Sequence, residues 1–148
     1  MLRVKFYDKV DDSLLMYAVI VSKSAGKWVF CKHKERETFE LPGGRREPGE
    51  AIIETARREL WEETGAKQYE IRPICVYSVS GVNSMRKDPA ESFGMLYSAE
   101  IYSFEPELHC EIERIVLFEE LPGNWTYPDI QPKLVERVAG VLCKPGNL

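Results

Sequence analysis

The chain has 148 residues, enough for one domain with a hydrophobic core, and we expect residues 1–148 to form a single domain. Its 44% hydrophobic and 30% charged content is typical of a globular protein and excludes a disordered chain. A net charge of −4 argues against a general nucleic-acid-binding surface, although metal ions can still bridge an anionic substrate to carboxylates. The N-terminus shows no signal-peptide pattern, and the longest apolar run, Leu14 to Val21, is too short to span a bilayer. We therefore expect a cytoplasmic protein that does not enter a membrane.

The first third of the chain predicts strands. Alternating apolar and polar residues from Leu2 to Tyr7 have the period of a half-buried strand. The apolar run at 14–21 predicts a buried central strand, and Gly26 allows a hairpin to a returning strand at 28–32. A short strand is expected at 38–41, followed by a tight turn at Gly43–Gly44.

The second half predicts three strands followed by a final helix. Strands are predicted at 68–80, 93–102 and 115–118, and an amphipathic helix from about Asp129 to Val141. The polar segment 81–91 between two of the strands is either a mobile hairpin tip or an edge of a substrate site. Hairpins combined with two helices predict an α+β sandwich around a mixed β-sheet.

The cysteines and histidines suggest no metal site. The four cysteines are widely separated and form no CxxC pair: Cys31, Cys75, Cys110 and Cys143. We expect them to be reduced and buried as small apolar residues. His33 and His109 stand alone, and we interpret each as a surface or packing residue.

The segment from Gly43 to Ala66 is the most informative part of the chain. It predicts a helix on which Glu59, Glu62 and Glu63 fall within roughly 100° of arc, because a helix turns about 100° per residue. Like charges at this spacing destabilise a helix by about 0.2–0.5 kcal/mol per pair. The pattern therefore indicates either a solvated acidic face or oxygen ligands for a hard divalent cation.

The same segment resembles the Nudix box, G-x5-E-x7-R-E-(apolar)-x-E-E-x-G-(apolar). The matching positions are Gly44, Glu50, Arg58, Glu59, Leu60, Glu62, Glu63 and Gly65. FELPGG before the box and EIERIVLFEEL, residues 111–121, also look like segments of this family. The resemblance implies a Nudix fold, an α/β/α sandwich around a mixed sheet.

The resemblance also implies a metal site and a set of catalytic residues. Mg²⁺ or Mn²⁺ would be held by Gly44, Glu50, Glu59, Glu62 and Glu63. Arg58 would orient Glu62 by a charge-assisted hydrogen bond. Glu62 is the first choice for the group that takes a proton from water. Glu111 is the second choice, and its alternative is a surface loop residue.

The implied reaction is pyrophosphohydrolysis, in which water attacks phosphorus. The leading substrate is a nucleoside triphosphate or an oxidised one such as 8-oxo-dGTP, since GKWVFCKHKERETFELPGG resembles a Gram-positive MutT-like branch. Alternatives are a triphosphorylated RNA 5′ end, a nucleoside diphosphate sugar, a dinucleoside polyphosphate, and a non-catalytic nucleotide-sensing module. A second copy of the chain, in a homodimer, is a further candidate partner. Four aromatic residues that could stack on a base stay unassigned: Trp28, Phe39, Trp125 and Tyr127.

Overall fold

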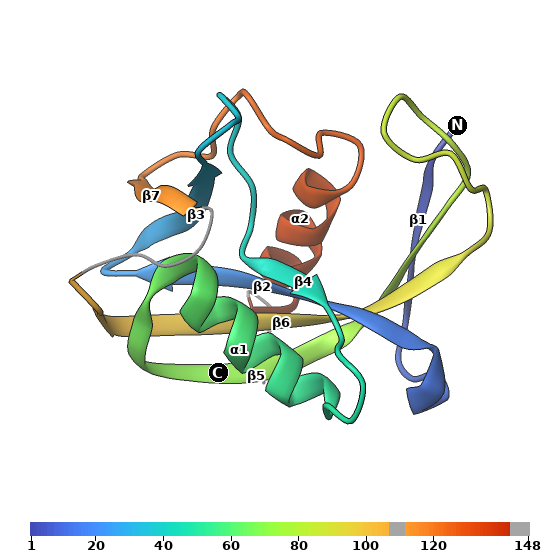
Figure 1. Cartoon of the computed structure of the whole chain (residues 1–148), viewed down its shortest axis with the longest axis horizontal. Helices are drawn as coiled ribbons and strands as arrows, with labels where there is room; N and C mark the ends of the chain where they lie inside the picture. The colour runs from blue at the N-terminus through green and yellow to red at the C-terminus, as the bar shows by residue number, and fades with distance from the viewer. Residues whose placement is uncertain (107–111, 143–148) are drawn as a thin grey trace.

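A computed structural model describes residues 1–106 and 112–142 (Figure 1). In chain order the elements are β1 (Arg3–Tyr7), the short 3-10 helix η1 (Asp12–Leu14), β2 (Leu15–Ser24), β3 (Lys27–His33), β4 (Gly43–Arg45), α1 (Ile52–Thr64), β5 (Ala66–Ser80), β6 (Ser92–Phe104), β7 (Ile112–Phe118) and α2 (Gln131–Leu142). Both expected helices and the expected strands other than the one at 38–41 are present with shifted ends. No helix in these described ranges has the length and apolar character needed to cross a membrane.

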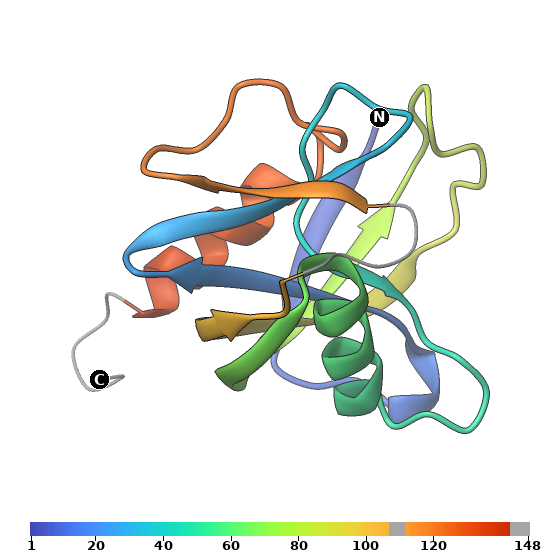
Figure 2. The same ribbon diagram turned by 60° about the vertical axis from the view of Figure 1, so that its left-hand side comes forward.

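All strands belong to one mixed sheet with the order β1-β5-β6-β2-β3-β7. The β2–β6 pair is parallel, and the other pairs are antiparallel. β2 shares one edge between two partners, because β4 pairs with residues 17–19 and β3 pairs only with residues 23–24. Beyond that short contact β3 diverges and pairs along its length with β7 (Figure 2). The sheet is therefore split along β2, between the residues that pair with β4 and the residues that pair with β3.

The two helices cover opposite faces of the sheet, which confirms the α+β sandwich. Ala18 and Ile20 of β2 belong to one buried cluster with Ala56 and Leu60 of α1. The alternating residues Val19 and Val21 belong to the other cluster, with Leu134, Val135 and Val138 of α2. The two faces follow from the strand period, since successive side chains of a strand point to opposite sides.

Helix α1 begins and ends as its local sequence dictates. The Glu54 side chain accepts a hydrogen bond of 2.7 Å from the Ala51 N–H and so satisfies a donor at the helix start. At the other end Gly65 has φ 73° and donates its N–H to the Trp61 carbonyl at 2.8 Å, a left-handed ending that favours glycine. Fully buried Leu60 fixes the rotation of the helix and turns the neighbouring glutamates toward β4.

Two local predictions were wrong. Residues 38–41 form only isolated bridges, from Glu40 to Cys31 and from Phe39 to Trp125, instead of a strand. Gly43–Gly44 is not a tight turn, because both glycines lie in β4, where Gly44 pairs with Ala18. Glycine is required at Gly43 for close approach, because a Cβ atom there would lie 2.5 Å from the backbone oxygen of Ala18. A Cβ atom on Gly44 would displace the Glu59 carboxylate.

The cysteine prediction is confirmed where the structure describes it. Cys31 and Cys75 are free and buried. Cys110, Cys143 and His109 lie outside the described residues.

Candidate active site

Three box glutamates project from α1 toward β4 and differ in burial. The side chains of Glu59 and Glu63 are 13% and 12% exposed, whereas that of Glu62 is 31% exposed. The Gly43 N–H donates a hydrogen bond of 2.7 Å to Glu63 Oε1. The glycine backbone of β4 therefore contacts the buried Glu63 carboxylate directly, with no side chain between them.

Arg58 binds most tightly to Glu50 and Glu59. Its guanidinium forms a two-pronged bond with Glu50, with Nε 2.6 Å from Oε2 and Nη2 3.1 Å from Oε1. Its Nη1 lies 2.6 Å from Glu59 Oε1 but 3.4 Å from Glu62 Oε2. The contact with Glu62 exists as predicted, yet it is the longest of the four. Arg58 accordingly clamps Glu50, which precedes the helix, to a carboxylate on the helix.

The pKa values of the site carboxylates differ with their burial and with their contact to Arg58. The Arg58 bond is the main cause that lowers the Glu50 pKa to about 2. Burial, followed by the charge of Glu63, raises the Glu59 pKa to about 7 despite the same arginine. Burial also raises the pKa of Glu63. Buried carboxylate oxygens that resist ionisation are suited to a hard divalent cation, which would supply the missing positive charge. The residues therefore fit Mg²⁺ or Mn²⁺.

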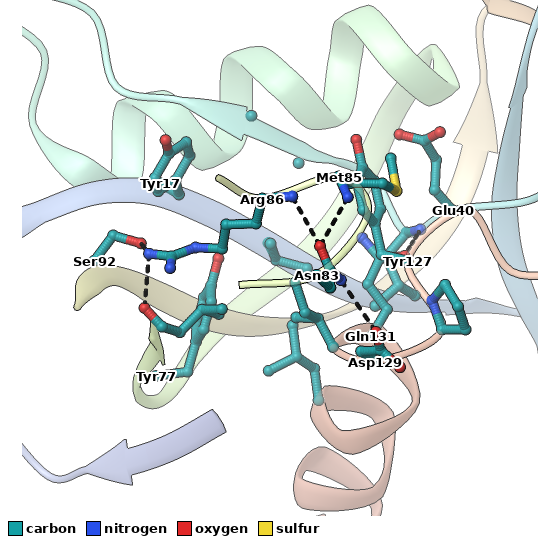
Figure 3. A pocket seen from close by; sticks show the side chains of 18 of the residues that line it. Tyr17, Glu40, Tyr77, Asn83, Met85, Arg86, Ser92, Tyr127, Asp129 and Gln131 are labelled. Carbon is teal, nitrogen blue, oxygen red and sulfur yellow. Dashed lines mark hydrogen bonds between the residues drawn. The ribbon is translucent and has the colours of Figure 1, made fainter. Parts of the chain in front are cut away.

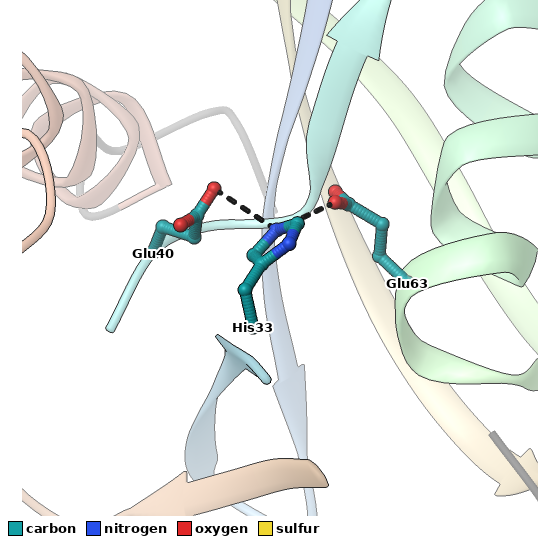
Figure 4. Close-up of side chains that lie close together, drawn as sticks. All are labelled: His33, Glu40 and Glu63. Atoms are coloured by element: carbon teal, nitrogen blue, oxygen red, sulfur yellow. Dashed lines mark ion pairs between the residues drawn. The ribbon is translucent and has the colours of Figure 1, made fainter. Parts of the chain in front are cut away.

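His33 joins this site from the end of β3, a position that the sequence prediction treated as surface or packing. Its Nε2 lies 3.4 Å from Glu63 Oε2 and 3.4 Å from Glu40 Oε2, between the two carboxylates (Figure 4). The Glu63 carboxylate beside it is the main cause that raises the pKa of His33. The three residues offer ligand atoms within 4.8 Å of one another. No local sequence pattern could have found this group, because each member comes from a different segment.

Glu59→Gln should make the metal-free protein more stable at pH 8 but not at pH 5. The Glu59 pKa of about 7 lies above the ordinary 4.5, so the folded state binds the extra proton and loses stability as the pH rises from 4.5 to 7. Removing the charge should raise the free energy of unfolding at pH 8 by about 1–3 kcal/mol. Urea denaturation in EDTA at both pH values measures this.

The comparison needs a control, because the raised His33 pKa also favours the folded state at low pH in the same window. This contribution is present in both proteins, so the difference between variant and wild type isolates Glu59. Glu136→Gln on the exposed face of α2 should give the same small difference at both pH values. An equal effect of Glu59→Gln at pH 5 and pH 8 would contradict the assignment.

A cavity of about 460 Å³ adjoins β4 on the side facing α2 (Figure 3). Gly43, Gly44 and Arg45 line one part of it, and the segment 127–131 lines another. Its volume lies in the range of small-molecule sites. The box glutamates Glu50, Glu59, Glu62 and Glu63 do not line this cavity, which lies on the other side of β4 and extends toward α2.

The loop 81–91 is shaped by one side chain and forms a wall of this cavity. The Arg86 guanidinium donates hydrogen bonds to the carbonyl oxygens of Val79, Gly81, Asp88 and Ala90 and to Ser92 Oγ. Asn83, Met85 and Arg86 line the cavity. The segment therefore lines a cavity, as the second of its two interpretations requires.

Of the four candidate stacking residues, only Tyr127 lines the cavity. Trp125 packs edge-on against Phe30, with ring centroids 5.1 Å apart, and Phe39 packs likewise against Phe118. Trp28 lies under the Lys23 ammonium instead. Glu111, the second candidate for the proton acceptor, lies outside the described residues.

Comparison with known proteins defines the class. Residues 15–138 match the model of the NUDIX domain. The Bacillus subtilis protein named "Putative 8-oxo-dGTP diphosphatase YtkD" is 31% identical over 123 residues, which cover 82% of this chain and 73% of that protein.

Solved structures agree with this result. The crystal structure of a mutant of the Bacillus subtilis pyrophosphohydrolase BsRppH superposes with a TM-score of 0.74 and 25% identity over 94% of this chain and 90% of that chain. A NUDIX hydrolase from Nitrosomonas europaea superposes with a TM-score of 0.66 and 21% identity, over 84% of this chain and 87% of that chain. By class the protein is a hydrolase with a mixed-sheet α+β fold. The chain belongs to the Nudix hydrolase family.

Proposed function

We propose that this protein is a divalent-metal-dependent pyrophosphohydrolase that cleaves a nucleoside triphosphate, or an oxidised one such as 8-oxo-dGTP, by attack of water on phosphorus. The observation that carries the proposal is that buried glutamates suited to a divalent cation lie on one side of β4, and a cavity of about 460 Å³ lies on the other side. The name of the Bacillus subtilis relative supports an oxidised guanine nucleotide. The likeness to BsRppH supports a triphosphorylated RNA 5′ end as the second candidate.

Each residue of the site has a role in this proposal. Glu59, Glu62 and Glu63 would hold Mg²⁺ or Mn²⁺ with Glu50 and the Gly44 carbonyl. When bound, the cation lowers the pKa of water and neutralises charge on the phosphate oxygens. Glu62, the most exposed of the three helix carboxylates, takes the proton from the attacking water. Four of these five groups lie on α1 and β4, which both pack directly on β2.

Hydrolysis in H₂¹⁸O tests the proposal. The protein is incubated with Mg²⁺ and, separately, GTP, 8-oxo-dGTP, triphosphorylated RNA, a UDP-sugar and a dinucleoside polyphosphate. We expect nucleoside monophosphate and pyrophosphate from a triphosphate, or 5′-monophosphorylated RNA, with ¹⁸O in one phosphate product. EDTA should abolish turnover. A protein that turns over none of these substrates but binds one of them would instead be a nucleotide-sensing module.

A further inference from the structure

A second group of possible metal ligands lies where the end of β3 meets the last turn of α1. His33 Nε2 lies between Glu40 Oε2 and Glu63 Oε2, 3.4 Å from each (Figure 4). The backbone N–H and carbonyl of Glu40 both bond to Cys31 of β3, which fixes Glu40 beside His33. Only Glu63 is shared with the Nudix box, because His33 and Glu40 lie outside it. The group therefore differs from the all-oxygen box site in its residues and in its ligand chemistry.

Each of the two carboxylates is held by one oxygen and directs the other at His33. The Gly43 N–H donates a hydrogen bond of 2.7 Å to Glu63 Oε1. Arg36 Nη1 donates one of 3.1 Å to Glu40 Oε1. The second oxygen of each carboxylate is the one that lies beside the imidazole. Outer hydrogen bonds that orient ligand side chains in this way are typical of metal sites in proteins.

The spacing of the three ligand atoms fits a shared cation. The Nε2 atom of His33 is buried and has no hydrogen-bond partner among the residues that the structure describes. Its 3.4 Å separations exceed the usual range of about 2.7–3.2 Å for an N–H···O bond. Two ligand atoms that lie about 2.1 Å from one cation at a tetrahedral angle are about 3.4 Å apart. A cation among these atoms would give Nε2 the partner that it lacks.

The imidazole nitrogen determines which cation this group prefers. Mg²⁺ favours oxygen ligands in an octahedral arrangement, whereas imidazole suits transition metals such as Zn²⁺. One histidine and two carboxylates are a ligand set that Zn²⁺ accepts, and they leave a fourth tetrahedral position for water. Glu40 also lines the cavity, which gives the cation a path of entry.

We infer that His33, Glu40 and Glu63 form a second cation site, which takes a divalent transition metal such as Zn²⁺ in preference to Mg²⁺. The cation would tie the end of β3 to the last turn of α1. The inference goes beyond the proposed function, because no step of the proposed reaction uses this cation.

Direct binding of Zn²⁺ tests the inference without any substrate. Protein labelled with ¹⁵N is titrated with Zn²⁺ in an excess of Mg²⁺, and the ring nitrogens of its two histidines are followed by NMR. We expect the Nε2 signal of His33 to shift as Zn²⁺ binds, while the ring signals of His109 stay in place. Mg²⁺ alone should leave the His33 signal unshifted. A His33 Nε2 signal that does not respond to Zn²⁺ would mean that the group is only an ion pair, and would overturn the inference.

Two variants identify the ligands. His33→Gln and Glu40→Gln should each weaken Zn²⁺ binding, measured by calorimetry in excess Mg²⁺, by at least about tenfold. Glu35→Gln is the matched control, because Glu35 is exposed in the same segment and is not one of the three ligands. It should bind Zn²⁺ as the wild type does. Thermal unfolding without metal checks that all three variants are folded.

The outcomes separate this inference from the proposed function. Zn²⁺ binding of wild-type strength in both His33→Gln and Glu40→Gln would overturn the inference and leave the hydrolase intact. A wild-type protein that binds Zn²⁺ through His33 but hydrolyses none of the nucleotide substrates would refute the proposed function and leave this cation site in place.

Discussion

Glu63→Gln and Glu62→Gln should each lower kcat by about 10²-fold or more while the protein stays folded. The fold should survive because a glutamine oxygen at position 63 can still accept the hydrogen bond from the Gly43 N–H. Its amide group can donate to Glu40 or His33, which now face the carboxylate. Activity should fall because a cation ligand or the proton acceptor has lost its charge. Steady-state kinetics with GTP at saturating Mg²⁺ measure the effect.

The two substitutions should share one response to metal. Because Glu62 and Glu63 are both proposed as ligands, loss of either should raise the Mg²⁺ concentration needed for half-maximal activity. Glu62 is also the proposed proton acceptor, so saturating Mg²⁺ should restore less of kcat in Glu62→Gln than in Glu63→Gln. Glu136→Gln on α2 is the matched control, with the same chemical change on a helix residue outside the cavity lining. Wild-type kcat in either box variant would refute its assignment.

Gly44→Ala should lower kcat/KM by about 10²-fold, because a displacement of about 1 Å in a catalytic group can cost this much. The new Cβ would collide with the Glu59 carboxylate, which would have to leave the Arg58 guanidinium. Gly140→Ala is the control, because its Cβ would meet open space on α2. It should retain activity and gain about 0.5–1 kcal/mol of stability.

A double-mutant cycle shows whether Gly44→Ala acts through Glu59. If the collision is the cause, Gly44→Ala should also lower the free energy of unfolding of the wild-type protein, and this loss should largely disappear in a Glu59→Ala background. A loss of the same size in both backgrounds would mean that alanine at position 44 disturbs the pairing of β4 with β2 instead.

The features that the sequence predicted are local ones. The period of three and four residues placed Glu59, Glu62 and Glu63 on one helix face, and Gly65 marked the helix end, because both depend only on neighbouring residues. The continuous apolar run at residues 14–21 predicted the central strand for the same reason. The sandwich followed from the order of these elements.

The features that were missed depend on contacts between distant segments. β4 was predicted as a turn, since two glycines carry no strand pattern, and only their pairing with residues 18 and 19 makes them extended. His33 meets Glu40 and Glu63 only because β3 diverges from β2. The Asn83–Asp129 bond joins two loops that no short pattern connects.

Because Arg86 binds main-chain groups, the shape of the loop 81–91 depends little on its other side chains. One guanidinium binds four carbonyl oxygens of the main chain, and main-chain groups are the same whatever side chains surround them. The exposed residues Val82 and Met85 can therefore be exchanged while the loop keeps its course. The glutamates of α1 belong to a different part of the fold. A protein built in this way can acquire new substrates by changing one loop, without rebuilding the machinery that breaks the bond.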